Sequence, residues 1–174
     1  MNMITDRYAS AVNSRSLTVE PRTRMSDTDV LGAYGLASRV TPLGVALERF
    51  FAGDGREAAN IVTELSQAAH RHSFKLDCRI SQVECDDMAK ACLAWHRNGT
   101  CRHCGGHGYL ISPGAPTLSE RECPACNNTG RRPLEQEFRL EHRELARWMV
   151  AELARETGRA GPEAMRALAP KLEL

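Results

Sequence analysis

Apolar side chains recur at intervals of three and four residues between residues 26 and 96, which is the spacing of one face of an α-helix. Ser26 precedes the first such stretch, and its hydroxyl is a favourable helix N-cap. A second stretch begins at Thr41, the expected cap, which is followed by proline at the first helical position. Asp54 and Glu57 resemble a capping box for a third helix. The pattern predicts a core of helices over this half of the chain.

A fourth helix is expected from about Asp77 to His96. Cys78, Cys85 and Cys92 follow one another at seven-residue intervals in it, so they fall on one stripe of the helix surface. Free cysteine is among the most buried residue types. We therefore interpret the three thiols as small apolar residues in a helix seam, since a second metal site would need further ligands from elsewhere.

The last part of the chain is expected to form helices that pack on this core. A long helix is predicted from about Leu134, because apolar residues line one face after that position. Gly158 is expected to end it, and Gly161 followed by Pro162 is expected to open a short last helix that reaches Leu168.

Three arginines, Arg139, Arg143 and Arg147, recur every four residues on another face of that long helix. Glu135 precedes Arg139 by four residues, which is a favourable helical pair. The row is open to two interpretations: a nucleic-acid contact, or a solvated helix face.

Two Cys-x-x-Cys motifs stand between these helical regions. A tight turn between two cysteines points both sulfurs the same way, and two such turns can close a tetrahedron around one metal ion. Glycines follow the first motif, and asparagines and a glycine follow the second, which suits turns that need positive φ. We predict a structural zinc site with four ligands: Cys101, Cys104, Cys123 and Cys126.

Other interpretations of these cysteines are less favoured. Disulfides need an oxidising compartment, yet no apolar core of signal-peptide length is found at the N-terminus. A thioredoxin-type pair would be a single motif between a strand and a helix. Iron could occupy the same four-sulfur cage. His103 and His107 could replace a ligand, but we expect them at the surface. Four thiolates leave no open position for water, so no catalytic metal is expected. Since no nucleophile paired with a base or carboxylate is discernible either, we expect no enzyme activity and no small-molecule substrate.

The stretches around residues 109–111 and Leu118 are expected to form two short strands joined through a Pro-Gly-Ala-Pro turn. The fold class is therefore mainly α, a helical domain with an inserted zinc ribbon that has two knuckles and a short β-hairpin. The expected division of the chain is a mobile arm over 1–25, a helical core over 26–96, a zinc-ribbon insert over 97–132, and C-terminal helices over 133–174.

The net charge of +1 hides an uneven distribution. Residues 26–96 carry seven basic and ten acidic side chains, whereas residues 97–132 carry five arginines and two glutamates. The insert is therefore the basic part, and a local basic patch on a nearly neutral protein can still bind nucleic acid. No run of eighteen apolar residues occurs, so no membrane span is expected.

A resemblance covers much of what has been described. The segment SDTDVLGAYGLA from Ser26, the helices after it, and the motifs CRHCGGHG and CPACNNTG at the end of a helix resemble the lambda-type Q antitermination proteins of bacteriophages. The cysteine-rich domain of DnaJ also repeats CxxCxGxG. It has four such knuckles where this chain has two, and it lacks the upstream segment.

The resemblance implies a phage late-gene transcription antitermination factor in the cytoplasm of a bacterial host. Such proteins bind double-stranded DNA beside the late promoter, load onto RNA polymerase paused with its sigma factor, and make it pass terminators. The four cysteines would hold zinc. The residues expected to contact DNA are Arg97, Arg102, Arg121, Arg131, Arg132, Arg139 and Arg143.

Two other function classes remain as alternatives. One is a zinc-dependent DNA-binding regulator that acts by occupancy alone. The other is a DnaJ-like module that binds unfolded peptide or a protein partner. The helical core over residues 26–96 is acidic to neutral, and we expect it to face the polymerase.

Overall fold

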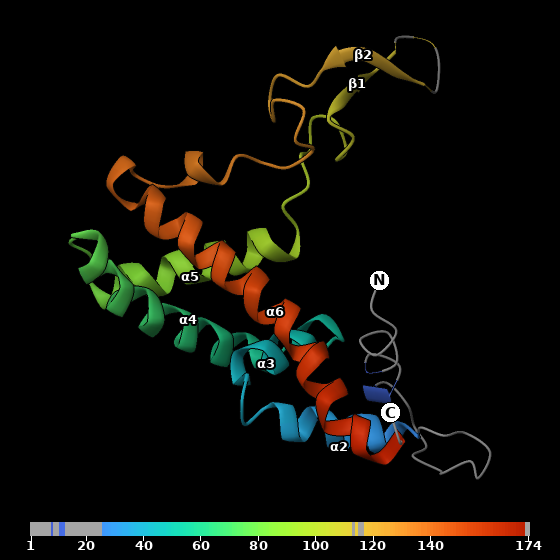
Figure 1. Cartoon of the computed structure of the whole chain (residues 1–174). Coiled ribbons are helices and arrows are strands. Elements are labelled where there is room, and N and C mark those ends of the chain that lie inside the picture. Colours follow the sequence, from blue (N-terminus) through green and yellow to red (C-terminus); the bar gives the residue numbers. More distant parts are fainter. Residues whose placement is uncertain (1–7, 9–10, 13–25, 113, 115–116, 173–174) are drawn as a thin grey trace.

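The structure is a computed structural model that describes Tyr8, Ala11, Val12, residues 26–112, Gly114 and residues 117–172. It is mainly helical, with one two-stranded sheet (Figure 1). None of the helices in the described part is long and apolar enough to cross a membrane. The α-helices are α2 (Asp27–Ala37), α3 (Pro42–Phe51), α4 (Glu57–Ser73), α5 (Gln82–Arg97) and α6 (Arg143–Leu172); the 3₁₀ turns are η1 (Phe74–Leu76), η2 (Leu134–Glu137) and η3 (Leu140–His142); the strands are β1 (Tyr109–Ile111) and β2 (Leu118–Glu122).

Helices α2 and α3 begin at the predicted residues, but the expected cap is formed only in α2. Ser26 caps α2 in a reciprocal box with Asp29. Thr41 makes no side-chain cap for α3; its buried hydroxyl donates to Glu156 of α6 at 2.8 Å. Asp54 does not cap α4, because its carboxylate is paired with Arg56 at 2.9 Å. Tertiary and ionic partners thus replaced two of the predicted caps.

Helix α5 begins at Gln82, five residues later than the expected start at Asp77. Ser81 caps it, in a reciprocal box with Glu84, and Cys78 lies before the first turn. Cys85 and Cys92 are completely buried in the helix, which confirms their interpretation as core residues.

The C-terminal helix corrects two predictions. It begins at Arg143, because the chain after Leu134 forms two short 3₁₀ turns, and it continues without a break through Gly158 and Pro162. A proline inside a helix costs about 3 kcal/mol. Residues after Pro162 are nonetheless buried against α2, Leu168 among them, so packing offsets that cost.

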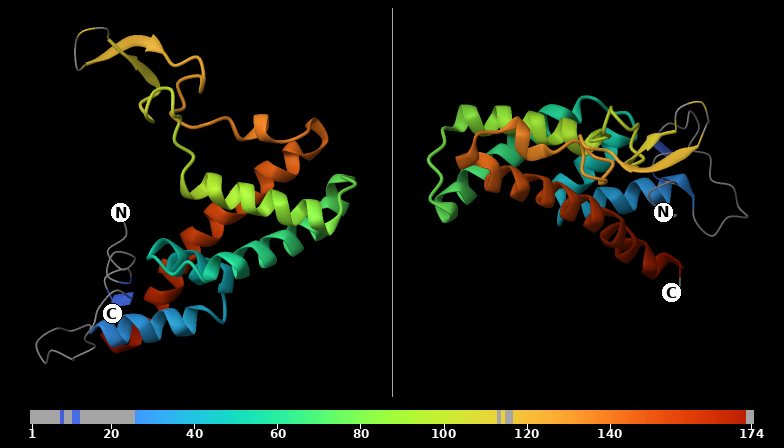
Figure 2. Two further views of the ribbon diagram at one scale, coloured as in Figure 1. Left: turned by 180° about the vertical axis from the view of Figure 1, so that it is seen from behind. Right: turned by 90° about the horizontal axis from the view of Figure 1, so that it is seen from above.

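Helix α6 contributes to two apolar cores, one at each half of its length, and α3 borders both of them. One core lies among α3, α4, α5 and the first half of α6. The other lies among α2, α3 and the last half of α6, and it includes Tyr8, which stacks on Tyr34 at 3.8 Å. The views in Figure 2 show α6 running past all the other helices of the body. The mobile arm predicted over residues 1–25 falls mostly outside the described residues, but Tyr8 itself is buried.

A buried carboxyl group in α3 makes stability depend on pH. Glu48 is only 8% exposed, and burial raises its pKa from 4.5 to about 7. Because the folded pKa lies above the unfolded one, the contribution of Glu48 to stability is fully present below pH 4.5 and is lost as the pH rises through 7. No ion pair offsets this burial among the described residues.

We predict that Glu48→Gln raises the free energy of unfolding by roughly 2 to 3 kcal/mol at pH 8 and by little at pH 4. Urea denaturation at both pH values measures the difference. Glu120→Gln, at an exposed position of β2, serves as the control. A Glu48→Gln effect of equal size at both pH values would contradict this assignment.

Candidate metal centre

The cysteine insert, residues 97 to 132, leaves the helical body at the end of α5 and projects away from it (Figures 1 and 2). Two segments connect the insert to the body, residues 99–101 and 130–132. They pair with each other, and we call them the neck. Thr100 and Arg131 form an antiparallel bridge, the amide of Cys101 donates to the carbonyl of Gly130 at 2.9 Å, and that of Arg132 donates to Gly99 at 2.8 Å. Both ends of the insert are therefore fixed to each other.

Trp95 ties this neck to α5. Its indole N–H donates to the carbonyl oxygen of Arg132 at 2.9 Å, and its ring lies under the Arg131 guanidinium at 4.8 Å. Gly99 packs against the same ring so closely that a Cβ there would lie about 3 Å from it. The helix pattern did not predict this role of Trp95; the glycine four residues later was the available signal.

The far end of the insert is the predicted hairpin. Strands β1 and β2 pair antiparallel, with Tyr109 opposite Glu122 and Ile111 opposite Leu118, and an irregularity between the two pairs. The hydroxyl of Ser119 donates to the carbonyl of Leu110 at 2.9 Å. Most of the predicted turn, at positions 113, 115 and 116, lies outside the described residues.

The turns after each Cys-x-x-Cys motif have the positive φ angles that their composition predicts. The two turns also pack directly on each other. A Cβ on Gly130 would collide with the carbonyl of Gly106, and a Cβ on Gly108 would lie 2.5 Å from the carbonyl of Asn128. Only glycine fits such an approach. The positive-φ residues are Gly105, Gly106, Gly108, Asn127, Asn128 and Gly130.

These turns bring all four predicted ligand thiols together. The sulfurs lie within 4.8 Å of one another, with 4.0 Å between Cys101 and Cys123 and 3.8 Å between Cys104 and Cys126. Each cysteine is at most 4% exposed. Four sulfurs at about 2.3 Å from one ion would stand about 3.8 Å apart in a tetrahedron. The four residues could therefore hold one metal ion.

The protonation of the cage also bears on metal binding. Burial raises the pKa of Cys126 to about 11. Burial acts in the same direction on Cys104, but amides of Gly108 and Gly106 outweigh it and lower that pKa to about 7. The Gly108 amide donates to the Cys104 sulfur at 3.3 Å. Without metal the Cys126 thiol stays protonated near neutral pH, so an ion that binds there has to displace its proton.

The two nearby histidines do not belong to the cage. His103 and His107 are exposed, which agrees with their expected surface position. Among the described residues, the four cysteines are the group whose ligand atoms lie close enough to share an ion.

The seven arginines predicted to contact DNA fall into two groups. Five lie on the insert or at its neck; of these, Arg102 and Arg132 line one polar cleft of about 320 Å³. Arg132 is also paired with Glu137 at 3.1 Å. The five are Arg97, Arg102, Arg121, Arg131 and Arg132.

The other two, Arg139 and Arg143, lie at the opposite end of α5. Arg139 contributes to the lowered pKa of Glu84, in the first turn of that helix, after the larger effect of hydrogen bonds from Ser81. The length of α5 corresponds to about 20 Å between the two groups. Arg139 also precedes α6, so the predicted arginine row does not exist on one helix.

The predicted pair between Glu135 and Arg139 is wrong as well. Glu135 belongs to η2 and is paired with Arg147 of α6 at 2.8 Å. The reason is that η2 is a 3₁₀ turn that contacts α6. It is not the α-helix that would place Glu135 and Arg139 one turn apart.

We predict that the protein binds one metal ion per chain and that Cys126→Ser loses it. Elemental analysis of the purified protein measures the metal, and circular dichroism should show most of the helix content retained, because the two apolar cores lie outside the insert. Cys78→Ser, a partly buried cysteine outside the cage, is the matched control. Loss of metal in the control, or its retention in Cys126→Ser, would refute the assignment.

Comparisons of the chain with protein-family models, with curated proteins and with solved structures found no match. What the site can do follows from its own geometry. It is a closed group of four buried thiols on a basic insert, and the insert is fixed at both ends to a helical body.

Proposed function

We propose that the four cysteines hold one structural zinc ion and that the insert is a zinc ribbon of the DnaJ-like type. The sulfur spacing suits a tetrahedral ion, and thiolate ligands favour zinc over harder metals. The hairpin and the tightly packed glycine turns support the ribbon assignment. With all four positions taken by sulfur, the ion serves to fold the insert.

We propose that the insert binds double-stranded DNA. One observation carries this proposal: the metal cage supports a segment with five arginines and two glutamates, which projects from a body whose residues 26–96 carry net negative charge. Arginines on such a segment can neutralise phosphates while the negatively charged body stays at a distance from the DNA. Arg97, Arg102, Arg121, Arg131 and Arg132 form the main contact, and Arg139 and Arg143 form a second one near η3.

The specific function that we propose is late-gene transcription antitermination in a bacteriophage. The protein docks beside the late promoter through its insert and is taken up by bacterial RNA polymerase paused there with its sigma factor. It then travels with the polymerase past terminators. The resemblance of the Ser26 segment and the two knuckles to Q antitermination proteins supports this assignment, together with the order of helix, insert and helix.

The two alternatives predict different effects on transcription. A regulator that acts by occupancy would change initiation only, because it keeps no contact with a polymerase that has left the promoter. A DnaJ-like peptide-binding module would be indifferent to DNA sequence near the promoter.

We predict that Arg102→Ala with Arg121→Ala flattens the slope of log DNA affinity against log salt by up to roughly two units, because each phosphate contact contributes about 0.9. Both side chains are exposed on the insert. The double change of Arg139 and Arg143 should flatten the slope less. Fluorescence anisotropy at several salt concentrations measures both, and an unchanged slope would place Arg102 and Arg121 outside the interface.

Purified transcription tests the complete proposal. On a cognate late promoter, with a matched bacterial polymerase, the protein should increase read-through of a distant terminator. Read-through should be lost when the promoter-proximal DNA element is scrambled, and also in Cys104→Ser. Equal read-through on the scrambled template, or none on the cognate one, would favour the alternatives.

A further inference from the structure

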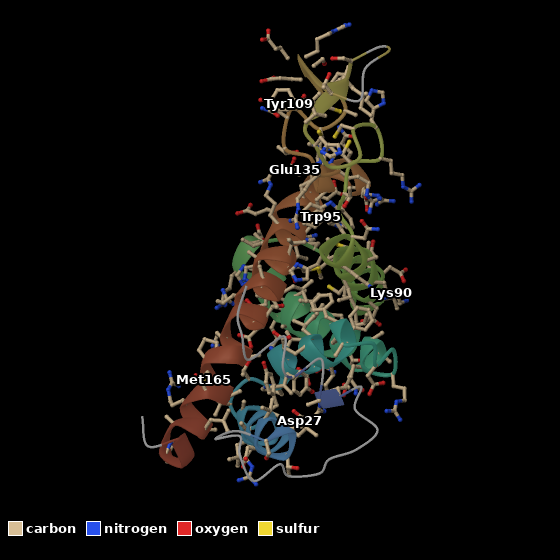
Figure 3. All side chains as sticks on the ribbon, turned by 90° about the vertical axis from the view of Figure 1, so that its right-hand side faces the viewer. Asp27, Lys90, Trp95, Tyr109, Glu135 and Met165 are labelled. Carbon is tan, nitrogen blue, oxygen red and sulfur yellow. The ribbon has the colours of Figure 1, made fainter. Side chains whose placement is uncertain are left out.

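A groove of about 540 Å³ lies where the insert meets the helical body. One wall comes from the second cysteine knuckle and the chain that follows it, and the other comes from α6. Figure 3 shows Trp95 and Glu135, which both line it, between the hairpin that carries Tyr109 and the helices below. The groove is open to solvent along one side.

The floor of the groove is apolar. Pro133 and Leu134 come from the segment entering η2, and Val150, Ala151 and Ala154 come from α6. Ala151 and Ala154 are exposed and lie one turn apart on the helix, and their small side chains leave the surface hollow. A hollow of this size accommodates one or two large apolar side chains from another molecule.

The rim of the groove is positively charged. Arg131, Arg132 and Arg147 line it together with one carboxylate, Glu135, and Arg132 is also paired with Glu137 just outside the lining. The Arg131 guanidinium is positioned over the Trp95 ring. Arg147 is paired with Glu135, but both side chains are about half exposed, so an incoming carboxylate can compete for that arginine at little cost.

We propose that this groove binds an acidic segment of a protein partner that carries apolar anchor side chains, such as one face of an amphipathic helix. The apolar floor takes the anchors, and the arginines of the rim pair with the carboxylates beside them. Duplex DNA fits the rim but not the floor, since no base or phosphate gains from burial against Val150 and alanines. A small molecule would keep too much of its surface exposed in an open groove.

The position of the groove makes this binding depend on the metal cage. Cys126, a ligand of the cage, lines the wall together with Asn127 and Thr129 of the same knuckle. Loss of the metal would therefore dismantle one wall while the α6 wall remains. This inference does not depend on antitermination or on DNA binding.

The test uses the full chain with metal bound, and fluorescein-labelled helical peptides of about four turns. A set of acidic peptides has leucine along one face and glutamate elsewhere; matched peptides replace either glutamate by lysine or leucine by serine. Anisotropy should show binding of acidic peptides only. No binding by any acidic peptide, or equal binding by the lysine or serine versions, would overturn the proposal.

Two variants locate the binding. Ala151→Gln with Ala154→Gln fills the hollow without adding charge, and glutamine is a good helix former, so the fold is expected to survive. This change should weaken acidic-peptide binding about tenfold or more and leave DNA affinity unchanged. The matched control is Ala59→Gln with Ala94→Gln, at exposed positions of α4 and α5 outside the groove lining.

Each of the other possible outcomes also tests the proposal. Unchanged peptide binding in the filled variant would place the site elsewhere and overturn the proposal. An equal loss of DNA affinity would make the groove part of the nucleic-acid surface, and a changed sedimentation coefficient would make it an interface between copies of the chain. Arg147→Glu changes the charged lining from three arginines and one glutamate to two of each, so it should abolish the preference for acidic over lysine peptides, which a purely structural role of Arg147 would not produce.

Discussion

The insert depends on one constraint, the meeting of four buried thiols that lie within 4.8 Å of one another and could share a single ion. Its apolar interior consists of the cysteines themselves, with Leu110 packed beside them. Two strands of three and five residues are too short to be stable alone. A metal bound to thiolates from both knuckles would supply that missing free energy, because the ligands meet only in the folded state. Everything the insert presents to a partner therefore depends on the cage.

Helix α6 has the corresponding role in the body. It contributes to both apolar cores, and the buried bond from Thr41 to Glu156 joins it to the start of α3. The same helix forms one wall of the groove beside the insert. The neck is fixed to α5 through Trp95, so the insert and α6 keep a defined position relative to each other. The proposed DNA contacts on the insert and the proposed partner contacts in the groove would then belong to one surface, since Arg131 and Arg132 are assigned to both.

Much of the site could be predicted from sequence because its chemistry is local. The spacing within each Cys-x-x-Cys motif, and the glycines and asparagines after it, determine where the sulfurs point and which turns form. The cap at Ser26 and the burial of Cys85 and Cys92 are also local, since they follow from one helix and its periodicity. The short hairpin was predictable from its two strand-forming stretches for the same reason.

Other features were decided by tertiary contacts. Gly158 and Pro162 carry the local signals of a helix end, yet α6 continues, because burial against α2 outweighs a lost backbone bond. Arg139 and Arg143 do not join the arginines of the insert, since η2 and η3 lead the chain to the far end of α5 before α6 begins. The sequence by itself determined the metal cage and the helical class. Only the tertiary structure decided which charges and apolar faces meet, because those pairs are distant in the chain and local propensity has no information about them.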